Sequence, residues 1–159
     1  MRILSIFNKK DEQFLRQKTE EVINPQDPAI RELIDTMRDI MEKNQGVGLA
    51  ANQIGKPWRI FVAEYQNQFF AFINPKIIKH SRKTTLAEEG CLSVPHIVGV
   101  VPRYDKIVIE GRDLNNKKFK IKASGMLARI FQHETDHLDG ILFIDKAKEL
   151  YHVKSSKND

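Results

Sequence analysis

Cysteine is almost absent from this chain, because Cys91 is the only one among 159 residues. A single cysteine excludes an internal disulfide bond, so the fold does not rely on the crosslinks of small secreted domains. No apolar run approaches the roughly 20 residues that a membrane-spanning helix needs. The N-terminus has only a short apolar patch before Lys9 and Lys10, without the apolar core of a secretory signal. We therefore expect a cytoplasmic protein with no membrane partner.

Neither charge sign dominates the sequence. Lys and Arg total 26 against 21 Asp and Glu, a net charge of +5, and the cations are scattered among the acids. Only the tail at 146–157 and a turn at 115–118 are locally basic. No aromatic residues alternate with these cations, which argues against a base-stacking platform and against sequence-specific nucleic-acid binding. We interpret most of the charge as a solvated surface, with weak ribosome association as the alternative for the basic tail.

The length and composition are those of one globular domain. Of the residues, 41% are hydrophobic and 30% are charged, values typical of ordinary domains that bury a core. We expect a single catalytic domain over 1–159, in which about 146–159 form a short basic C-terminal tail. No heptad pattern or large apolar stripe is evident, so we expect a monomer.

The hydrophobic periodicity predicts an α+β fold. Apolar residues at helical spacing predict a helix from Pro28 to Asn44 with Asp27 as its cap, and a shorter helix over 11–21 with Phe14 and Leu15 inward. The middle of the chain changes to strand periodicity. We expect mostly antiparallel strands at 58–64, 69–73, 77–78, 106–110 and 119–122, with turns at 66–67 and 115–116. Pro75 is expected to end the second strand, and a last helix is expected between Ser124 as cap and Gly140 as stop.

That last helix carries the most informative motif of the sequence, His133-Glu134-Thr135-Asp136-His137, which is a His-Glu-x-x-His pattern. Four residues make slightly more than one helical turn, so the two histidines share a face and can hold one metal ion. Glu134 lies at the edge of that face, where its carboxylate can reach a water on the metal. The pattern is typical of metal-assisted hydrolysis of an amide-like bond.

A catalytic metal site needs a third protein ligand and an open position, and Cys91 is the best candidate for the ligand. A lone cysteine is more often a small core residue. Here Gly90 lets the backbone bend and Pro95 lacks an N–H donor, features typical of a loop between strands. A thiolate with two imidazoles suits Fe(II), Zn or Ni rather than Mg or Ca. The glycine-rich stretch 46–55 permits close approach of another backbone, although a flexible helix-to-strand connection explains it equally well.

Three segments, in this order, resemble peptide deformylases: Gly46-Val47-Gly48-Leu49-Ala50-Ala51-Asn52-Gln53, Glu89-Gly90-Cys91-Leu92-Ser93 and Gln132-His133-Glu134-Thr135-Asp136-His137-Leu138. The resemblance covers most of the chain. It implies antiparallel strands packed around a central helix that carries the two histidines. It also implies removal of the formyl group from N-formylmethionine of nascent polypeptides, with release of formate. The family further implies one Fe(II) ion per chain, although Zn, Ni or Co accept the same ligands.

The motifs and the resemblance together assign roles to individual residues. Cys91, His133 and His137 would bind the metal, and water in its fourth position would be the nucleophile. Glu134 would act as general base and then general acid. The side-chain amide of Gln53 and the backbone N–H of Leu92 would stabilise the oxyanion. The expected substrate-binding residues are Val47, Gly48, Leu49, Met126 and Ile130, with Leu92 and His133 also beside the methionine side chain.

Some of these assignments have alternatives. Met126 and Ile130 are equally consistent with an ordinary core. Asp136 would orient a ligand imidazole, pair with Arg103, or simply lie on the helix surface. Glu89 is expected to support the Cys91 loop through an ion pair with Arg103.

Two other functions fit part of the sequence. A zincin-type metallopeptidase also uses His-Glu-x-x-His, but that class usually takes a carboxylate or a histidine as third ligand. A basic RNA-binding module with a structural metal would need four protein ligands. The sequence offers no second cysteine and no obvious fourth donor.

Overall fold

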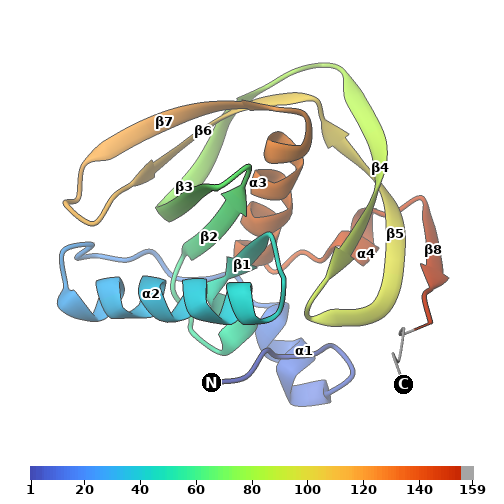
Figure 1. The fold of residues 1–159 in the computed structure, drawn as a ribbon, viewed down its shortest axis with the longest axis horizontal. Helices are drawn as coiled ribbons and strands as arrows, with labels where there is room; N and C mark the ends of the chain where they lie inside the picture. Colours follow the sequence, from blue (N-terminus) through green and yellow to red (C-terminus); the bar gives the residue numbers. More distant parts are fainter. Residues whose placement is uncertain (155–159) are drawn as a thin grey trace.

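The computed structural model describes residues 1–154 and has two antiparallel β-sheets with a helix, α3, between them (Figure 1). The strand order is β1–β2–β3–β6–β7 in the five-stranded sheet and β4–β5–β8 in the three-stranded sheet. The strands are β1 Gly48–Ala50, β2 Ile60–Tyr65, β3 Gln68–His80, β4 Thr84–Cys91, β5 Val94–Tyr104, β6 Lys106–Arg112, β7 Lys118–Ser124 and β8 Glu149–His152. The predicted α+β class, with strands around a helix that carries both histidines, is confirmed.

The helices are α1 Lys9–Leu15, α2 Pro28–Lys43, the 3-10 turn η1 Ala51–Ile54, α3 Gly125–Leu138 and α4 Phe143–Lys146. Helix α2 agrees with the prediction, and the Asp27 side chain accepts a hydrogen bond from the Ala29 N–H. Helix α1 is shorter than expected and begins earlier, because the Asn8 side chain caps it by accepting from the first free N–H groups. Ser124 does precede α3, but its side chain makes no capping hydrogen bond, and Gly125 turns the chain with φ 59°.

The expectation that Pro75 ends a strand is wrong. β3 continues through Pro75 to His80, so the strand expected at 77–78 is its second half. A register shift against β6 between Ile73 and Lys76 forms a bulge, where a residue without an N–H can be accommodated. Asn74 has φ 53°, and its side chain exchanges two hydrogen bonds with the backbone of Val22, which holds the bulge in place.

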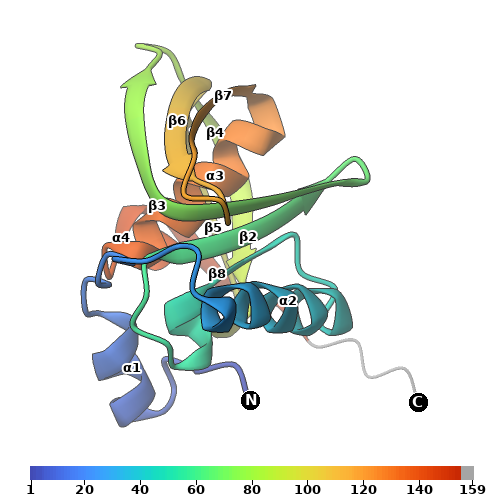
Figure 2. The same ribbon diagram turned by 90° about the vertical axis from the view of Figure 1, so that its left-hand side faces the viewer.

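The five-stranded sheet has a helix on each face, but the two helices cover different numbers of strands. Helix α3 packs across all five strands on one face, and α2 packs on β1 and β2 on the other (Figure 2). On the α3 side, Phe61, Phe72 and Phe131 are fully buried with ring centroids 4.9–5.9 Å apart. This rigid packing fixes the position of α3, and therefore of its histidines.

The C-terminal segment is partly a strand, which the sequence did not predict. β8 pairs antiparallel with β5, from Ile97↔His152 to Val100↔Glu149. The end of the expected basic tail, 155–159, lies outside the described residues. Within residues 1–154, no helix is long and apolar enough to cross a membrane.

Candidate metal centre and active site

Three possible metal ligands converge at the interface between α3 and the β4–β5 hairpin. Cys91 is the last residue of β4, and His133 and His137 lie one turn apart on α3. Their ligand atoms lie within 4.8 Å of one another, and Cys91 Sγ is 3.2 Å from His137 Nε2. In a tetrahedral site with bonds of about 2.0 and 2.3 Å, a nitrogen and a sulfur ligand lie about 3.5 Å apart. The three donors therefore fit a single metal ion.

The His133 ring is held from its far side by Glu89. His133 Nδ1 donates to Glu89 Oε1 at 2.8 Å, which leaves Nε2 on the side of Cys91. A carboxylate behind a ligand histidine is the usual device that fixes the ring orientation. Glu89 also accepts two hydrogen bonds from Arg103, both at 2.9 Å, which confirms the predicted ion pair.

Arg129 is a supporting residue that the sequence analysis missed. Its Nη1 donates to Glu89 Oε2 at 2.6 Å and to the Val101 carbonyl, and its Nη2 donates to the Thr85 carbonyl. These bonds tie α3 to β4 and β5, so the end of β4, which carries Cys91, stays beside the two histidines. The signal was present in the sequence, because Arg129 is a charged residue one turn before His133 among apolar neighbours.

Burial, hydrogen bonds and neighbouring charges shift the pKa values of Glu89, His133 and His137. Burial raises the pKa of Glu89, but hydrogen bonds from His133 and Arg103 outweigh it and hold that pKa far below its usual range. Burial lowers the pKa of His133, yet hydrogen bonds to Cys91 and Glu89 raise it to about 10. For His137, burial and the neighbouring His133 both lower the pKa. Hydrogen bonds to Cys91 and then Glu89 favour the charged form of His133, whereas His137 Nδ1 has no hydrogen-bond partner among the described residues.

Glu134 is buried beside the candidate metal ligands. Burial raises its pKa to about 7. Its Oε2 atom has no hydrogen-bond partner among the described residues. The side chain packs against Gly48, where a Cβ atom would lie 2.5 Å from Glu134 Oε1. A carboxylate with a pKa near neutral is suited to take up and release a proton.

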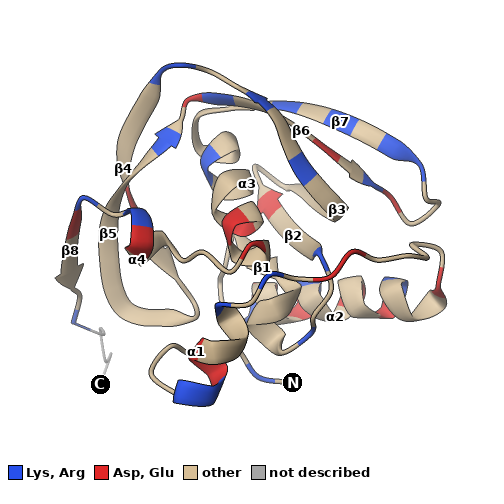
Figure 3. Cartoon of the chain, turned by 180° about the vertical axis from the view of Figure 1, so that it is seen from behind, with Lys and Arg blue, Asp and Glu red and all other residues tan. Residues whose placement is uncertain are grey.

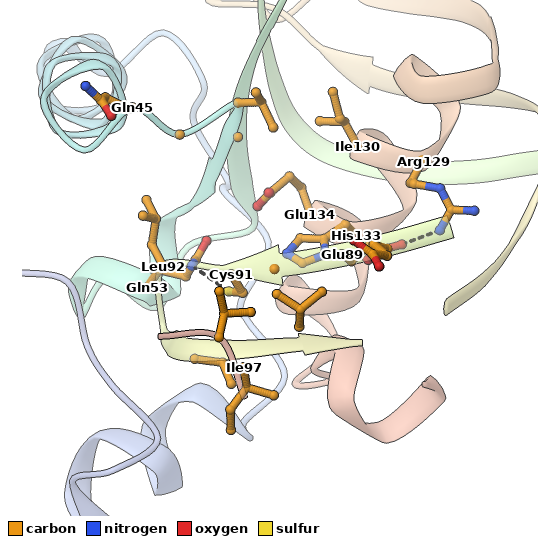
Figure 4. A pocket seen from close by; sticks show the side chains of 18 of the residues that line it. Gln45, Gln53, Glu89, Cys91, Leu92, Ile97, Arg129, Ile130, His133 and Glu134 are labelled. Carbon is orange, nitrogen blue, oxygen red and sulfur yellow. Dashed lines mark hydrogen bonds and ion pairs between the residues drawn. The ribbon is translucent and has the colours of Figure 1, made fainter. Parts of the chain in front are cut away.

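Gln53 points its amide group at the same centre (Figure 4). Its Oε1 accepts from the Ala50 N–H at 2.9 Å, so Nε2 faces Cys91 Sγ at 3.5 Å and Ser93 Oγ at 3.1 Å. Leu92 follows Cys91 in the turn between β4 and β5 and lines the same cavity. Both predicted oxyanion donors therefore belong to residues at the site.

A cavity of about 580 Å³ opens onto these groups. Val47, Gly48, Met126 and Ile130 line it, as the sequence predicted for substrate-binding residues. Leu49 does not, because its side chain is fully buried in the core between α2 and the sheet. In a strand neighbouring side chains point to opposite faces, and the assignment of Leu49 to substrate binding stays a prediction.

Asp136 faces away from the ligand group. It pairs with Arg103 and lies 3.0 Å from the Lys146 ammonium. Of the three alternatives, the pairing with Arg103 is therefore the one that the structure contains. Asp136 therefore pairs with Arg103, which in turn bonds to Glu89.

The family model described as polypeptide deformylase matches residues 3–153. The chain belongs to this family. A curated peptide deformylase from Treponema pallidum is 43% identical over 129 residues, 81% of this chain and 80% of the relative. One from Syntrophomonas wolfei is 48% identical over 121 residues, 76% of this chain and 79% of the relative.

Solved structures of peptide deformylases have the same fold. The crystal structure from Thermotoga maritima matches with a TM-score of 0.87 and 35% identity, covering 93% of this chain and 97% of that one. The Synechococcus elongatus enzyme in complex with actinonin matches with a TM-score of 0.87 and 32% identity, over 94% of this chain and 79% of that one.

The protein is therefore a metal-dependent deformylase that removes the formyl group from N-formylmethionine of nascent polypeptides. The Cys-His-His group supports one metal ion per chain. The zincin alternative is not favoured, because the family and structural matches are to deformylases.

Proposed function

We propose that Cys91, His133 and His137 are the metal ligands of this deformylase and that Fe(II) is the native ion. The convergence of one thiol and two imidazole donors within 4.8 Å carries this proposal. Thiolate and imidazole ligands suit Fe(II) and also accept Zn, Ni or Co. When bound, the ion supplies a Lewis acid that makes a water molecule acidic and polarises the formyl carbonyl.

Glu134 is the proposed general base and acid. It removes a proton from the attacking water as the water oxygen bonds to the formyl carbon. It then gives that proton to the amine nitrogen as the carbon–nitrogen bond breaks, so formate and a free N-terminal amine leave. The pKa of about 7, raised by burial, supports both steps, because the group is basic enough to accept and acidic enough to donate near neutral pH.

Gln53 and Leu92 are the proposed stabilisers of the negative charge that develops on the formyl oxygen. The Gln53 amide supports this role because its carbonyl is already occupied by the Ala50 N–H, which leaves the NH₂ group turned toward the reacting centre. The backbone N–H of Leu92 would be the second donor. Loss of one such donor typically costs about 3–4 kcal/mol in the transition state.

The cavity accounts for the proposed substrate preference. Val47, Met126 and Ile130 offer apolar surface for the methionine side chain. The backbone of Gly48 would pair with the extended peptide, as in strand addition. A formyl group has only hydrogen beside its carbonyl, so a crowded centre excludes the bulkier acetyl group.

Two substitutions test the catalytic roles. Glu134→Ala should keep its metal and lose turnover, whereas Cys91→Ala should lose both. The measurements are metal content of anaerobically purified protein and formate release from formyl-Met-Ala, with an unformylated, internally cleavable peptide as the control substrate. A Cys91→Ala variant with full metal content would overturn the ligand set.

We also propose that the chain acts as a monomeric single-domain enzyme in the cytoplasm, in weak association with ribosomes. The support is the substrate itself, because formylated chain starts emerge from ribosomes. Light scattering of the purified protein tests the monomer, and cosedimentation with ribosomes tests the association. Residues 155–159 of the predicted basic tail lie outside the described part of the chain.

A further inference from the structure

One part of the five-stranded sheet is covered by helix on one face only. Helix α3 lies against every strand on one face, whereas α2, on the opposite face, packs on β1 and β2. Among residues 1–154, no helix covers that opposite face over β6, β7 and the second half of β3 (Figures 1 and 2). We call this area the outer face.

The strand register shows which side chains share the outer face. On β7, Lys118, Lys120 and Lys122 are exposed and alternate with residues that pack in the core on the α3 side. Directly paired residues in adjacent strands point to the same side. The pairs are Arg112↔Lys118, Glu110↔Lys120, Val108↔Lys122 and Lys106↔Ser124 between β6 and β7, and Lys76↔Glu110 and Lys79↔Val108 between β3 and β6.

These strand positions of the outer face therefore hold seven cations and one acid, Glu110, which lies 3.9 Å from Lys118. At one end of the face, Glu21 and Asp139 line a hollow beside Lys76, Arg112 and Lys118, together with Lys18 and Arg59. The whole chain has 26 Lys and Arg and 21 Asp and Glu, so 19 cations and 20 acids remain elsewhere. The excess positive charge of the protein is thus concentrated on this one face. Figure 3 shows the cationic segments along β6 and β7. Along the sequence these residues look scattered, and only the sheet pairing brings them together.

A hollow of about 450 Å³ lies at one end of the outer face. Its lining includes Lys79, Lys106 and Lys122, one from each strand, together with the hydroxyl-bearing Ser81 and Ser124. Ammonium and hydroxyl groups are donors to phosphate oxygens. At the rim, the His80 ring stacks on Tyr104 with centroids 3.7 Å apart.

We propose that the outer face is a binding surface for the phosphate backbone of RNA. Lysines at alternate strand positions repeat about every 7 Å, which provides a regular row of cations for a polyanion. Val108 is the one apolar side chain among the paired outward positions of β6 and β7, and a membrane-binding face would need more apolar groups to insert. None of the seven cations lines the catalytic cavity, so this binding does not rest on the proposed catalytic residues.

Fluorescence anisotropy with a labelled 20-base-pair RNA duplex tests the proposal, in KCl from 50 to 300 mM. If about four phosphates are contacted, log K should fall with log[salt] with a slope near −4. The triple variant K118E/K120E/K122E should bind at least tenfold more weakly at the lowest salt, with a slope about 2–3 smaller in magnitude. Its hydrolysis of formyl-Met-Ala should be unchanged, which shows that it folds and separates this result from a failure of the catalytic assignment.

Two further variants keep the test decisive. K9E/K10E/K43E makes the same change in net charge at exposed lysines outside the outer face and should retain binding. K76Q/K79Q/K106Q, which adds no charge opposite Glu110, should lose affinity and serves if the first variant does not fold. The proposal is wrong if both glutamate triples weaken binding equally, if the wild-type protein shows no salt-dependent RNA binding, or if it prefers anionic phosphatidylglycerol vesicles at equal phosphate concentration.

Discussion

Substitution of Glu89 by Gln should weaken both the fold and the metal site. The Glu89 side chain is 5% exposed and lies between the guanidinium groups of Arg103 and Arg129 and the ring of His133. Glutamine keeps the shape but removes the negative charge, and its NH₂ group cannot accept from an arginine. Two buried cations would then have lost their common partner.

The size of the effect follows from this arrangement. Removal of one member of a buried ion pair costs about 3–5 kcal/mol, because the remaining charge is left uncompensated. Arg103 keeps its pair with Asp136, so Arg129 is the cation that is left uncompensated. For a protein of this length, each kcal/mol corresponds to roughly 2–4 °C in Tm, so a loss of about 3 kcal/mol should lower Tm by roughly 6–12 °C. Loss of the negative charge behind the His133 ring should separately weaken metal binding by about 10–100-fold.

Both effects can be measured without interference between them. Urea denaturation in the presence of a chelator reports the stability of the metal-free protein, and a metal titration reports the affinity. Glu88→Gln is the matched control, since Glu88 is the exposed neighbour and its side chain bonds only to Tyr151 among the described residues. The reasoning is refuted if Glu89→Gln unfolds at the same urea concentration as wild type and binds metal with unchanged affinity.

Three further outcomes follow from the structure. Gly48→Ala should lower kcat about 100-fold with metal content unchanged, because the new Cβ would displace the Glu134 carboxylate. Gly90→Ala is the control, since a Cβ there would meet only one atom, at 4.0 Å. Equal kcat values for the two variants would contradict this prediction. Phe131→Ala should cost about 3–5 kcal/mol in urea denaturation, because the ring is fully buried among three other phenylalanines, and a loss below about 1 kcal/mol would count against that packing. Hydrogen bonds from the Arg2 side chain and then the Ser5 N–H lower the pKa of Asp11 to about 2, so the ion pair stabilises the folded state above pH 4 and less as pH falls toward 2. Asp11→Asn should therefore lower Tm at pH 7 by more than at pH 3. An equal decrease in Tm at the two pH values would disprove this.

The parts of the fold that could be predicted from the sequence are those whose chemistry is local. Helix α2 was predicted within one residue, because an Asp cap, a proline in the first turn and a continuous apolar stripe all specify the same element. The two histidines and Glu134 could be placed for a similar reason, since four residues on one helix have a fixed geometry. The β2–β3 and β6–β7 hairpins were recognisable from alternation around short polar turns.

The β4–β5–β8 sheet could not be predicted in the same way. β5 contains two prolines and a glycine, residues that usually argue against a strand, and its apolar run has no clear alternation. β8 is a four-residue exposed strand whose only partner within residues 1–154 is β5, so nothing in its own sequence specifies it. β8 depends on contacts with a strand distant in the sequence, and the same is true of the position of Cys91 beside the histidines.

The support for the metal centre shows why such a site is hard to read from residue types alone. Glu89, Arg103, Arg129 and Asp136 come from β4, β5 and α3, and each is an ordinary charged residue in its own segment. Taken together they form a buried network in which one carboxylate fixes the ring of a proposed ligand while two arginines bond to that carboxylate. The ligands decide which ion can bind, but this network decides where Cys91 and His133 lie relative to each other. We therefore expect Glu89→Gln to damage metal affinity although it removes no ligand, which is the result that separates a positioning network from a merely structural ion pair.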